Sequence, residues 1–181
     1  MTLLPRNPGR PFKRLFFALP VNDAQRRALA QWRSGLALRS GKPVPADNFH
    51  VTLLFLGDVD AVQVPAICAA VDQLPVPVAM PRLLLDRLHV WQRASALVLE
   101  AQQTPFDLLQ LVYGLQQAML PLGLQAPSRE YRPHLTLARD YRNCPPEATS
   151  APEFYLAPEH FTLYESRKGA YWPLAQWPLR K

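Results

Sequence analysis

The sequence has few of the residues that several functional classes require. Its 181 residues include 2 cysteines and 7 glycines. Cys68, on the apolar side of an expected helix, and Cys144, in a proline-rich loop, are expected to be unpaired thiols, which suits a reducing cytoplasm. The glycines form no glycine-rich loop that could cradle a phosphate. We therefore expect neither a disulfide framework nor a phosphate site built on such a loop.

Long apolar runs and acidic clusters are also missing. No stretch of about 20 apolar residues could span a membrane, and residues 1–14 lack the apolar run and small-residue cleavage site of an export signal. We expect no export and no membrane anchor, and we expect residues 1–13 to be a flexible segment. The sequence has neither an acidic cluster nor a pair of histidines on one helix face, which are signals of a metal site. No metal or other cofactor is therefore expected.

The composition is that of a globular protein with a basic surface. Hydrophobic residues make up 49% of the chain and aromatic residues 10%, which is enough for one sizeable core. We expect residues 1–181 to form a single domain and a monomer. The formal net charge of +6 favours a polyanionic partner such as nucleic acid. The 20 prolines mark many loops and favour a segmented chain of strands and helices over a helical bundle.

A four-residue pattern, His-x-Thr-Leu, occurs three times. It starts at His50, His134 and His160 and so uses three of the 4 histidines. A shuffled chain of this composition would place both residues at this spacing after a given histidine roughly once in 180 cases, so chance is a poor explanation.

The spacing of two places each histidine beside its threonine on one face of a strand, because side chains alternate across the pleat. His50 thus shares a face with Thr52, and His134 shares a face with Thr136. An imidazole can give or take a proton near neutral pH, and a threonine hydroxyl can donate a hydrogen bond to a phosphate oxygen. Two such strands facing each other would supply an acid, a base and two oxyanion donors.

The segments before the motifs distinguish the three copies. A helix over residues 22–34 and a loop are expected before His50, and a helix over residues 104–120 and a loop before His134. His160 follows a proline-rich stretch without helical periodicity. We interpret His50 and His134 as the functional pair, and His160 as a surface or core histidine on a strand.

Apolar periodicity and turn residues predict alternating strands and helices. Gly57 is expected to end the strand that carries His50. Asn22 and Gln25 are expected to cap a helix with the buried stripe Ala24, Ala28, Trp32 and Leu36. The expected strands cover residues 15–19, 49–56, 83–90, 94–101, 133–139, 160–166 and 170–176, and the expected helices cover residues 22–34, 60–74 and 104–120.

Four segments resemble, in order, the landmarks of a known family. They are residues 14–19 (RLFFAL), 48–57 (NFHVTLLFLG), 132–139 (RPHLTLAR) and 163–167 (LYESR). Over nearly its whole length the chain is similar to the RNA 2′,3′-cyclic phosphodiesterases of the two-histidine phosphoesterase superfamily, formerly described as 2′-5′ RNA ligases. The two His-x-Thr motifs of that family match those at His50 and His134, and His160 matches no active-site position.

The resemblance implies an α+β fold: one bilobal domain whose two pseudo-twofold-related antiparallel sheets line a cleft, with helices on the outer faces. It also implies hydrolysis of RNA 2′,3′-cyclic phosphate ends to 2′-phosphomonoesters, with His50 as the acid that protonates the 3′ oxygen and His134 as the base. Such ring opening needs an acid and a base on opposite sides of the phosphorus and requires no metal.

Thr52 and Thr136 are expected to hold the non-bridging oxygens of the phosphate, helped by Arg139. The sequence equally allows Arg139 to be an ordinary surface cation at the end of a strand. Three other functions stay open. The cleft could join RNA ends through a 2′-5′ link, open a small cyclic nucleotide phosphate, or bind a nucleotide or RNA end without turning it over.

Overall fold

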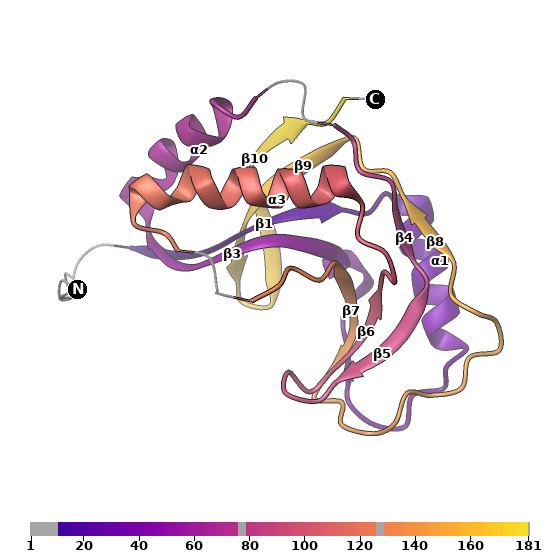
Figure 1. Ribbon diagram of the computed structural model, residues 1–181. Helices are drawn as coiled ribbons and strands as arrows, with labels where there is room; N and C mark the ends of the chain where they lie inside the picture. Colours follow the sequence, from indigo (N-terminus) through magenta and orange to yellow (C-terminus); the bar gives the residue numbers. More distant parts are fainter. Residues whose placement is uncertain (1–10, 76–78, 126–128, 181) are drawn as a thin grey trace.

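The computed structural model describes residues 11–75, 79–125 and 129–180. Two four-stranded antiparallel sheets lie side by side (Figure 1). Sheet A has the strand order β10-β9-β1-β3, sheet B has the order β2-β7-β6-β5, and β4 and β8 form a separate pair. Helices α2 and α3 pack together over sheet A, and α1 lies beside β8.

The bounds of the elements within the described residues are as follows. The strands are β1 (Phe12–Pro20), β2 (Lys42–Pro43), β3 (His50–Asp60), β4 (Leu83–Leu85), β5 (Arg87–Trp91), β6 (Ala96–Glu100), β7 (His134–Arg139), β8 (Phe154–Leu156), β9 (His160–Arg167) and β10 (Ala170–Pro178). The helices are α1 (Asp23–Ser34), α2 (Val64–Asp72) and α3 (Phe106–Met119), with short 3₁₀ turns η1 (Ala46–Asn48), η2 (Ala61–Gln63) and η3 (Leu120–Leu122).

The expected α+β class with antiparallel sheets is confirmed. The pair β4 and β8 was not expected, because both strands are short and distant in sequence. Most of the segment expected to be flexible, residues 1–13, lies outside the described residues. Its last two residues, Phe12 and Lys13, are the first residues of β1 and pair with Asp60 and Val59 of β3, so the expectation is wrong for them.

One strand–helix–strand unit occurs in each sheet. In sheet A, β1 leads through α1 to its antiparallel neighbour β3, and in sheet B, β6 leads through α3 to its antiparallel neighbour β7. The registers correspond: Ala18 lies opposite Thr52, and Val98 lies opposite Thr136. The two His-x-Thr strands therefore hold equivalent places in two copies of one unit, which agrees with the expected twofold relation.

Local sequence signals account for much of this architecture. The side chain of Asn22 accepts a hydrogen bond from the Gln25 backbone N–H at 2.8 Å, and the side-chain oxygen of Gln25 accepts one from the Asn22 backbone N–H at 3.1 Å, so α1 begins with the expected capping box. Two expectations are wrong. The strand of His50 does not end at Gly57 but passes through a bulge there and continues to Asp60. The buried residue of α1 is Leu29, and Ala24 and Ala28 of the expected stripe are exposed. The other two residues of the stripe agree with the expectation, because Trp32 packs against the core and Leu36 is buried.

The helix-covered core and the candidate site lie on opposite faces of sheet A. Alternate residues of β1, among them Leu15, Phe17 and Leu19, are fully buried, as are Leu108 and Leu115 of α3. Because α2 and α3 cover this face (Figure 1), the opposite face of β1 and β3, which carries the His50 side chain, is turned away from these helices.

Candidate active site

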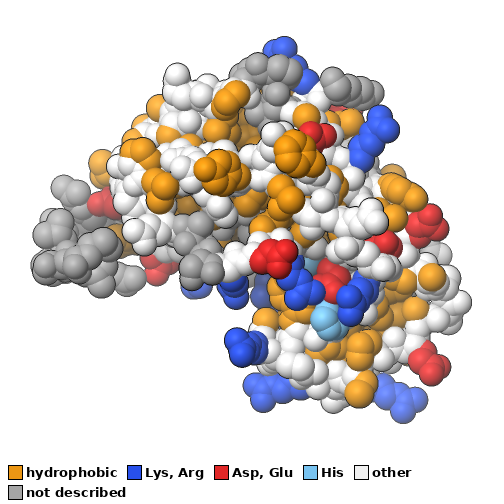
Figure 2. All heavy atoms as spheres, in the orientation of Figure 1, with side chains coloured by type: hydrophobic (Ala, Val, Ile, Leu, Met, Phe, Trp, Pro, Cys, Tyr) orange, Lys and Arg blue, Asp and Glu red, His pale blue; other side chains and the backbone are white. Residues whose placement is uncertain are grey.

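The two His-x-Thr strands meet although they belong to different sheets. Strand β3 of sheet A is in contact with β7 of sheet B. His50, Thr52, His134 and Thr136 are half-buried, whereas the alternating residues of the same strands, such as Val51, are buried in the core. In the face drawn in Figure 2, histidine lies in a hollow between the two parts of the molecule, beside Lys and Arg side chains.

The imidazole of His50 is fixed by its own strand. Its Nδ1 lies 2.7 Å from the carbonyl oxygen of Asn48, so Nδ1–H donates to that carbonyl. In the neutral ring the other nitrogen, Nε2, is then an acceptor, and the hydroxyl of Thr52 donates to it at 2.9 Å. The rings of Phe16 and Tyr171 pack against the imidazole, each with its centroid 5.1 Å away. Two hydrogen bonds and two ring contacts therefore fix the orientation of this imidazole.

His134 repeats the same bond in the other sheet. Its Nδ1–H donates to the carbonyl of Arg132 at 2.9 Å, again two residues earlier in the chain. The ring of Trp91 lies 4.0 Å from the imidazole, centroid to centroid. In both histidines Nδ1 is hydrogen-bonded to a backbone carbonyl, so in both Nε2 is the atom available for proton transfer.

Burial and charge favour neutral imidazoles in the free protein. Burial lowers the pKa of His50 to about 4, the bond to Asn48 opposes this shift, and the positive charges of His134 and Arg139 add to it. Burial also lowers the pKa of His134, while the bond to Arg132 and the charge of Glu100 raise it part of the way back. An anion between the two rings favours their protonated forms.

Arg139 lies close to this pair. It is exposed at the end of β7, its Nη2 is 3.4 Å from the hydroxyl of Tyr171 on β10, and its charge acts on His50. The side chain thus spans the two sheets next to the histidines. Its position agrees with a role toward an anionic ligand.

Several residues around the pair carried no recognisable signal in the sequence. Trp91 and Tyr171 pack on the imidazoles, and the hydroxyl of Tyr131 donates to the Thr52 carbonyl at 2.8 Å. Glu100 and His89, whose Nδ1 lies 2.9 Å from a Glu100 oxygen, form a polar network beside His134. These contacts join distant parts of the chain, and no local spacing indicates them.

The third His-x-Thr strand lies in the same sheet as the first. Ala18 of β1 is paired with Thr52 on one side and with Thr162 of β9 on the other, and Thr162 is only 1% exposed. His160 pairs with Pro178 of β10. The copy at His160 therefore does not come from the opposite sheet, as the copy at His134 does.

Other expectations concern metals, membranes and cysteines. Over residues 11–75, 79–125 and 129–180, no group of three or more His, Cys, Asp or Glu side chains is placed to hold a metal ion. No helix in that part of the chain has the length and apolar character needed to cross a membrane. Cys68 and Cys144 are free thiols, as expected.

Comparison with known proteins identifies the family. The model of the LigT-like phosphoesterase family matches residues 19–98, which include His50 and Thr52. The RNA 2′,3′-cyclic phosphodiesterase of Escherichia coli (strain K12) is 33% identical over 92% of this chain and 97% of its own. The protein of that name from Geobacillus stearothermophilus is 27% identical over 76% of this chain and 44% of its own.

Solved structures give the same answer. The crystal structure of E. coli LigT complexed with 3′-AMP superposes with a TM-score of 0.84 at 31% identity, covering 94% of this chain and 100% of that one. A Thermus thermophilus protein superposes with a TM-score of 0.77 at 26% identity, covering 92% of this chain and 98% of that one. The chain belongs to the LigT-like phosphoesterase family. The family and the fold expected from the sequence are thereby confirmed.

Proposed function

We propose that this protein hydrolyses the 2′,3′-cyclic phosphate ends of RNA to 2′-phosphomonoesters, acting in the cytoplasm as a single bilobal domain and a monomer. The observation that carries the proposal is the pair of equivalent His-x-Thr strands, β3 and β7, brought into contact from two sheets. The E. coli and Geobacillus relatives are RNA 2′,3′-cyclic phosphodiesterases by name, which supports the substrate class. The net charge of +6 supports a polyanionic substrate.

The reaction uses the two Nε2 atoms. Nε2 of His134 takes a proton from a water molecule, whose oxygen forms a bond to phosphorus. The bond from phosphorus to the 3′ oxygen breaks, and Nε2–H of His50 gives that oxygen its proton. The products are a 2′-phosphate and a free 3′-hydroxyl, and no metal takes part.

These roles require His50 to be protonated in the complex, although burial lowers its pKa to about 4 in the free protein. The negative charge of the cyclic phosphate supplies the opposing effect, since a nearby anion raises the pKa of an imidazole. His134 must be neutral, which its lowered pKa favours. Substrate binding therefore sets the protonation of His50.

Thr52 couples this change to phosphate binding. Its hydroxyl donates to Nε2 of neutral His50, and a protonated Nε2–H no longer accepts that bond. The hydroxyl is then free to donate to a non-bridging phosphate oxygen, as Thr136 does from the other strand, and Arg139 offsets the charge that develops.

The test is a reaction of the protein with an RNA oligomer ending in a 2′,3′-cyclic phosphate, in EDTA, with the product identified by ³¹P NMR and mass spectrometry. We expect complete conversion to the 2′-phosphate. Binding without turnover would show a binding module, joined oligomers would show a ligase, and a 3′-phosphate would show that the two histidines have exchanged roles.

A further inference from the structure

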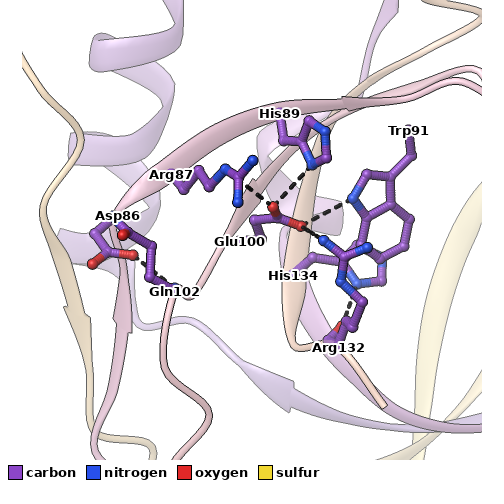
Figure 3. A network of polar contacts seen from close by, with 8 residues as sticks. All are labelled: Asp86, Arg87, His89, Trp91, Glu100, Gln102, Arg132 and His134. Atoms are coloured by element: carbon purple, nitrogen blue, oxygen red, sulfur yellow. Dashed lines mark hydrogen bonds and ion pairs between the residues drawn. The ribbon is translucent and has the colours of Figure 1, made fainter. Parts of the chain in front are cut away.

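A buried carboxylate lies at the back of His134 (Figure 3). Glu100, the last residue of β6, is only 3% exposed. An isolated buried carboxylate is costly, and such groups are normally paired or hydrogen-bonded. Both oxygens of Glu100 are occupied: Oε1 lies 2.9 Å from His89 Nδ1 and 3.5 Å from Arg87 Nε, and Oε2 lies 3.0 Å from Trp91 Nε1 and 2.8 Å from Arg132 Nη2.

Two of these partners also touch His134. Trp91 packs its ring on the imidazole at 4.0 Å, and the backbone carbonyl of Arg132 accepts the Nδ1–H bond at 2.9 Å. The guanidinium of Arg132 lies over the Trp91 ring, 5.2 Å from its centroid. Glu100 itself is the register partner of His134 across β6 and β7. Figure 3 shows these side chains converging from β5, β6 and the segment before β7.

The repeated unit shows that the carboxylate is a feature of one copy. In sheet A the residue opposite His50, in the place that Glu100 holds opposite His134, is Pro20. The imidazole of His50 is nevertheless oriented by the same backbone bond two residues earlier. The strand pairing of the unit therefore does not require a carboxylate at this place, and its presence beside His134 alone makes the two histidines unequal.

We propose that Glu100 is a positioning residue for His134: it holds Trp91 and Arg132 against the imidazole and supplies the negative charge that the ring faces when it carries a proton. The inference rests on the proposed function, in which His134 exchanges a proton during turnover. The alternative is that Glu100 only neutralises Arg87 and Arg132 and stabilises the fold.

The charges around His134 are mixed. Burial lowers its pKa, the bond to the Arg132 carbonyl and the charge of Glu100 raise it, and the guanidinium groups of Arg132 and Arg129 lower it. From sheet A, His50 faces the same ring. Among these side chains Glu100 is the group whose charge favours imidazolium, so removing that charge moves the pKa of His134 down.

The first experiment compares E100Q with the wild type in hydrolysis of RNA ending in a 2′,3′-cyclic phosphate. We expect kcat to fall roughly 10-fold or more with KM within about threefold, because a small misplacement of a group that acts on the reacting atoms can cost on the order of 10²-fold. The limb of the pH–rate profile that reports His134 moves to lower pH. Movement of the acidic limb identifies His134 as the base, and movement of the alkaline limb identifies it as the acid.

Glu165 offers a matched control. It is also a buried carboxylate, 8% exposed, and is paired with Lys13 at 3.0 Å in sheet A. E165Q is expected to keep the wild-type kcat and pH profile. Equal kcat and unshifted limbs in E100Q and wild type would overturn the inference, as would an equal change in E165Q.

A second readout does not depend on activity. The titration of His134 is followed by ¹⁵N NMR of the imidazoles and assigned with the variant His134→Gln. We expect a lower pKa for His134 in E100Q than in wild type and no change in E165Q. If the wild type does not hydrolyse the RNA but His134 shifts in E100Q, the proposed function fails and the effect of Glu100 on His134 stands.

If circular dichroism shows that E100Q is not folded, the variant W91F tests the same network through the contact between Trp91 and His134. Phenylalanine keeps an aromatic ring beside His134, but it loses the Nε1–H bond to Glu100 and the larger indole surface under Arg132. We expect a loss of roughly several-fold in kcat with KM within about threefold, because a slightly misplaced imidazole transfers its proton less efficiently. An unchanged kcat in a folded W91F would overturn the positioning role.

Discussion

At the scale of single residues, the two histidines share one backbone hydrogen bond and differ in their surroundings. Each donates Nδ1–H to the carbonyl two residues before it, so each presents Nε2. His50 is enclosed by Phe16 and Tyr171, whereas Trp91 covers one side of His134. Equal orientation with unequal environment is what an acid and base pair needs, because the two groups must hold opposite protonation states.

His50→Ala and His134→Ala are each expected to reduce turnover of cyclic-phosphate RNA by roughly 10²–10⁴-fold, the usual range for a lost general acid or base. The measurement is kcat at saturating substrate, with thermal unfolding as the control. Because both side chains are half-buried on the site face, the melting temperature should change little. Wild-type turnover in either variant would rule out the two-histidine mechanism.

His160→Ala should leave kcat within a few-fold of wild type, far from the roughly 10²-fold floor for an acid or base. The reason is positional: β9 lies in sheet A on the far side of β1 from β3, so His160 does not approach from the opposite sheet. The same kinetic assay measures it. A loss as large as that of His134→Ala would mean that β9, and not β7, carries the second functional histidine.

At the scale of elements, the bulge in β3 shapes the strand that carries His50. The register between β1 and β3 shifts where Leu15 pairs with Gly57 and Phe16 pairs with Phe55. Gly57 has a φ of +76°, a conformation that L-residues adopt at a cost. The bulge lets β3 continue to Asp60 while its first half keeps His50 and Thr52 on the site face.

Gly57→Ala is expected to lower the free energy of unfolding by about 1–2 kcal/mol, the cost of a left-handed backbone for an L-residue. The added methyl group meets nothing closer than Phe55 at 3.8 Å, so the cost comes from the backbone. Urea denaturation measures it. The control is Gly114→Ala within α3, where the methyl group meets the flexible end of Leu74 at 3.3 Å and stability should stay within about 1 kcal/mol of wild type. An equal loss in both variants would contradict the argument.

At the scale of the whole molecule, the site is an interface between two sheets. The contact between β3 and β7 puts two imidazoles and the guanidinium of Arg139 close together. Burial, together with the charges of His134 and Arg139, lowers the pKa of His50 and favours its neutral form. The folded protein therefore excludes a proton that the unfolded chain accepts.

This proton exclusion predicts a pH dependence of stability. Below about pH 6.5 the unfolded chain binds a proton at His50, whereas the folded protein does so only near pH 4. Stability is therefore fully present above this window and falls as the pH is lowered through it. Urea unfolding at a series of pH values measures the effect. His50→Gln should lose less stability than wild type over the same range, and an equal loss would assign the dependence to other groups.

The chain's own sequence determined the features that depend on near neighbours. The spacing of two in His50-x-Thr52 and His134-x-Thr136 needs only the strand pleat, and the cap at Asn22 needs only the next three residues. The repeated unit and the α+β class followed from the order of such local elements. Helical period also predicted one apolar face for the first helix, but Ala24 and Ala28 of that face are exposed, whereas Leu36 is buried as expected.

Only the tertiary structure decided what surrounds each histidine. Glu100 is a buried charge because three donors from β5 and one from the segment before β7 surround it on β6. The ring of Tyr171 packs on His50 although β10 and β3 are opposite edge strands of sheet A. Residues far apart in the chain meet through strand pairing and sheet packing, which depend on the burial of the whole core. A local pattern contains no information about those partners. The sequence therefore indicated the two imidazoles, and the tertiary structure gave them different environments.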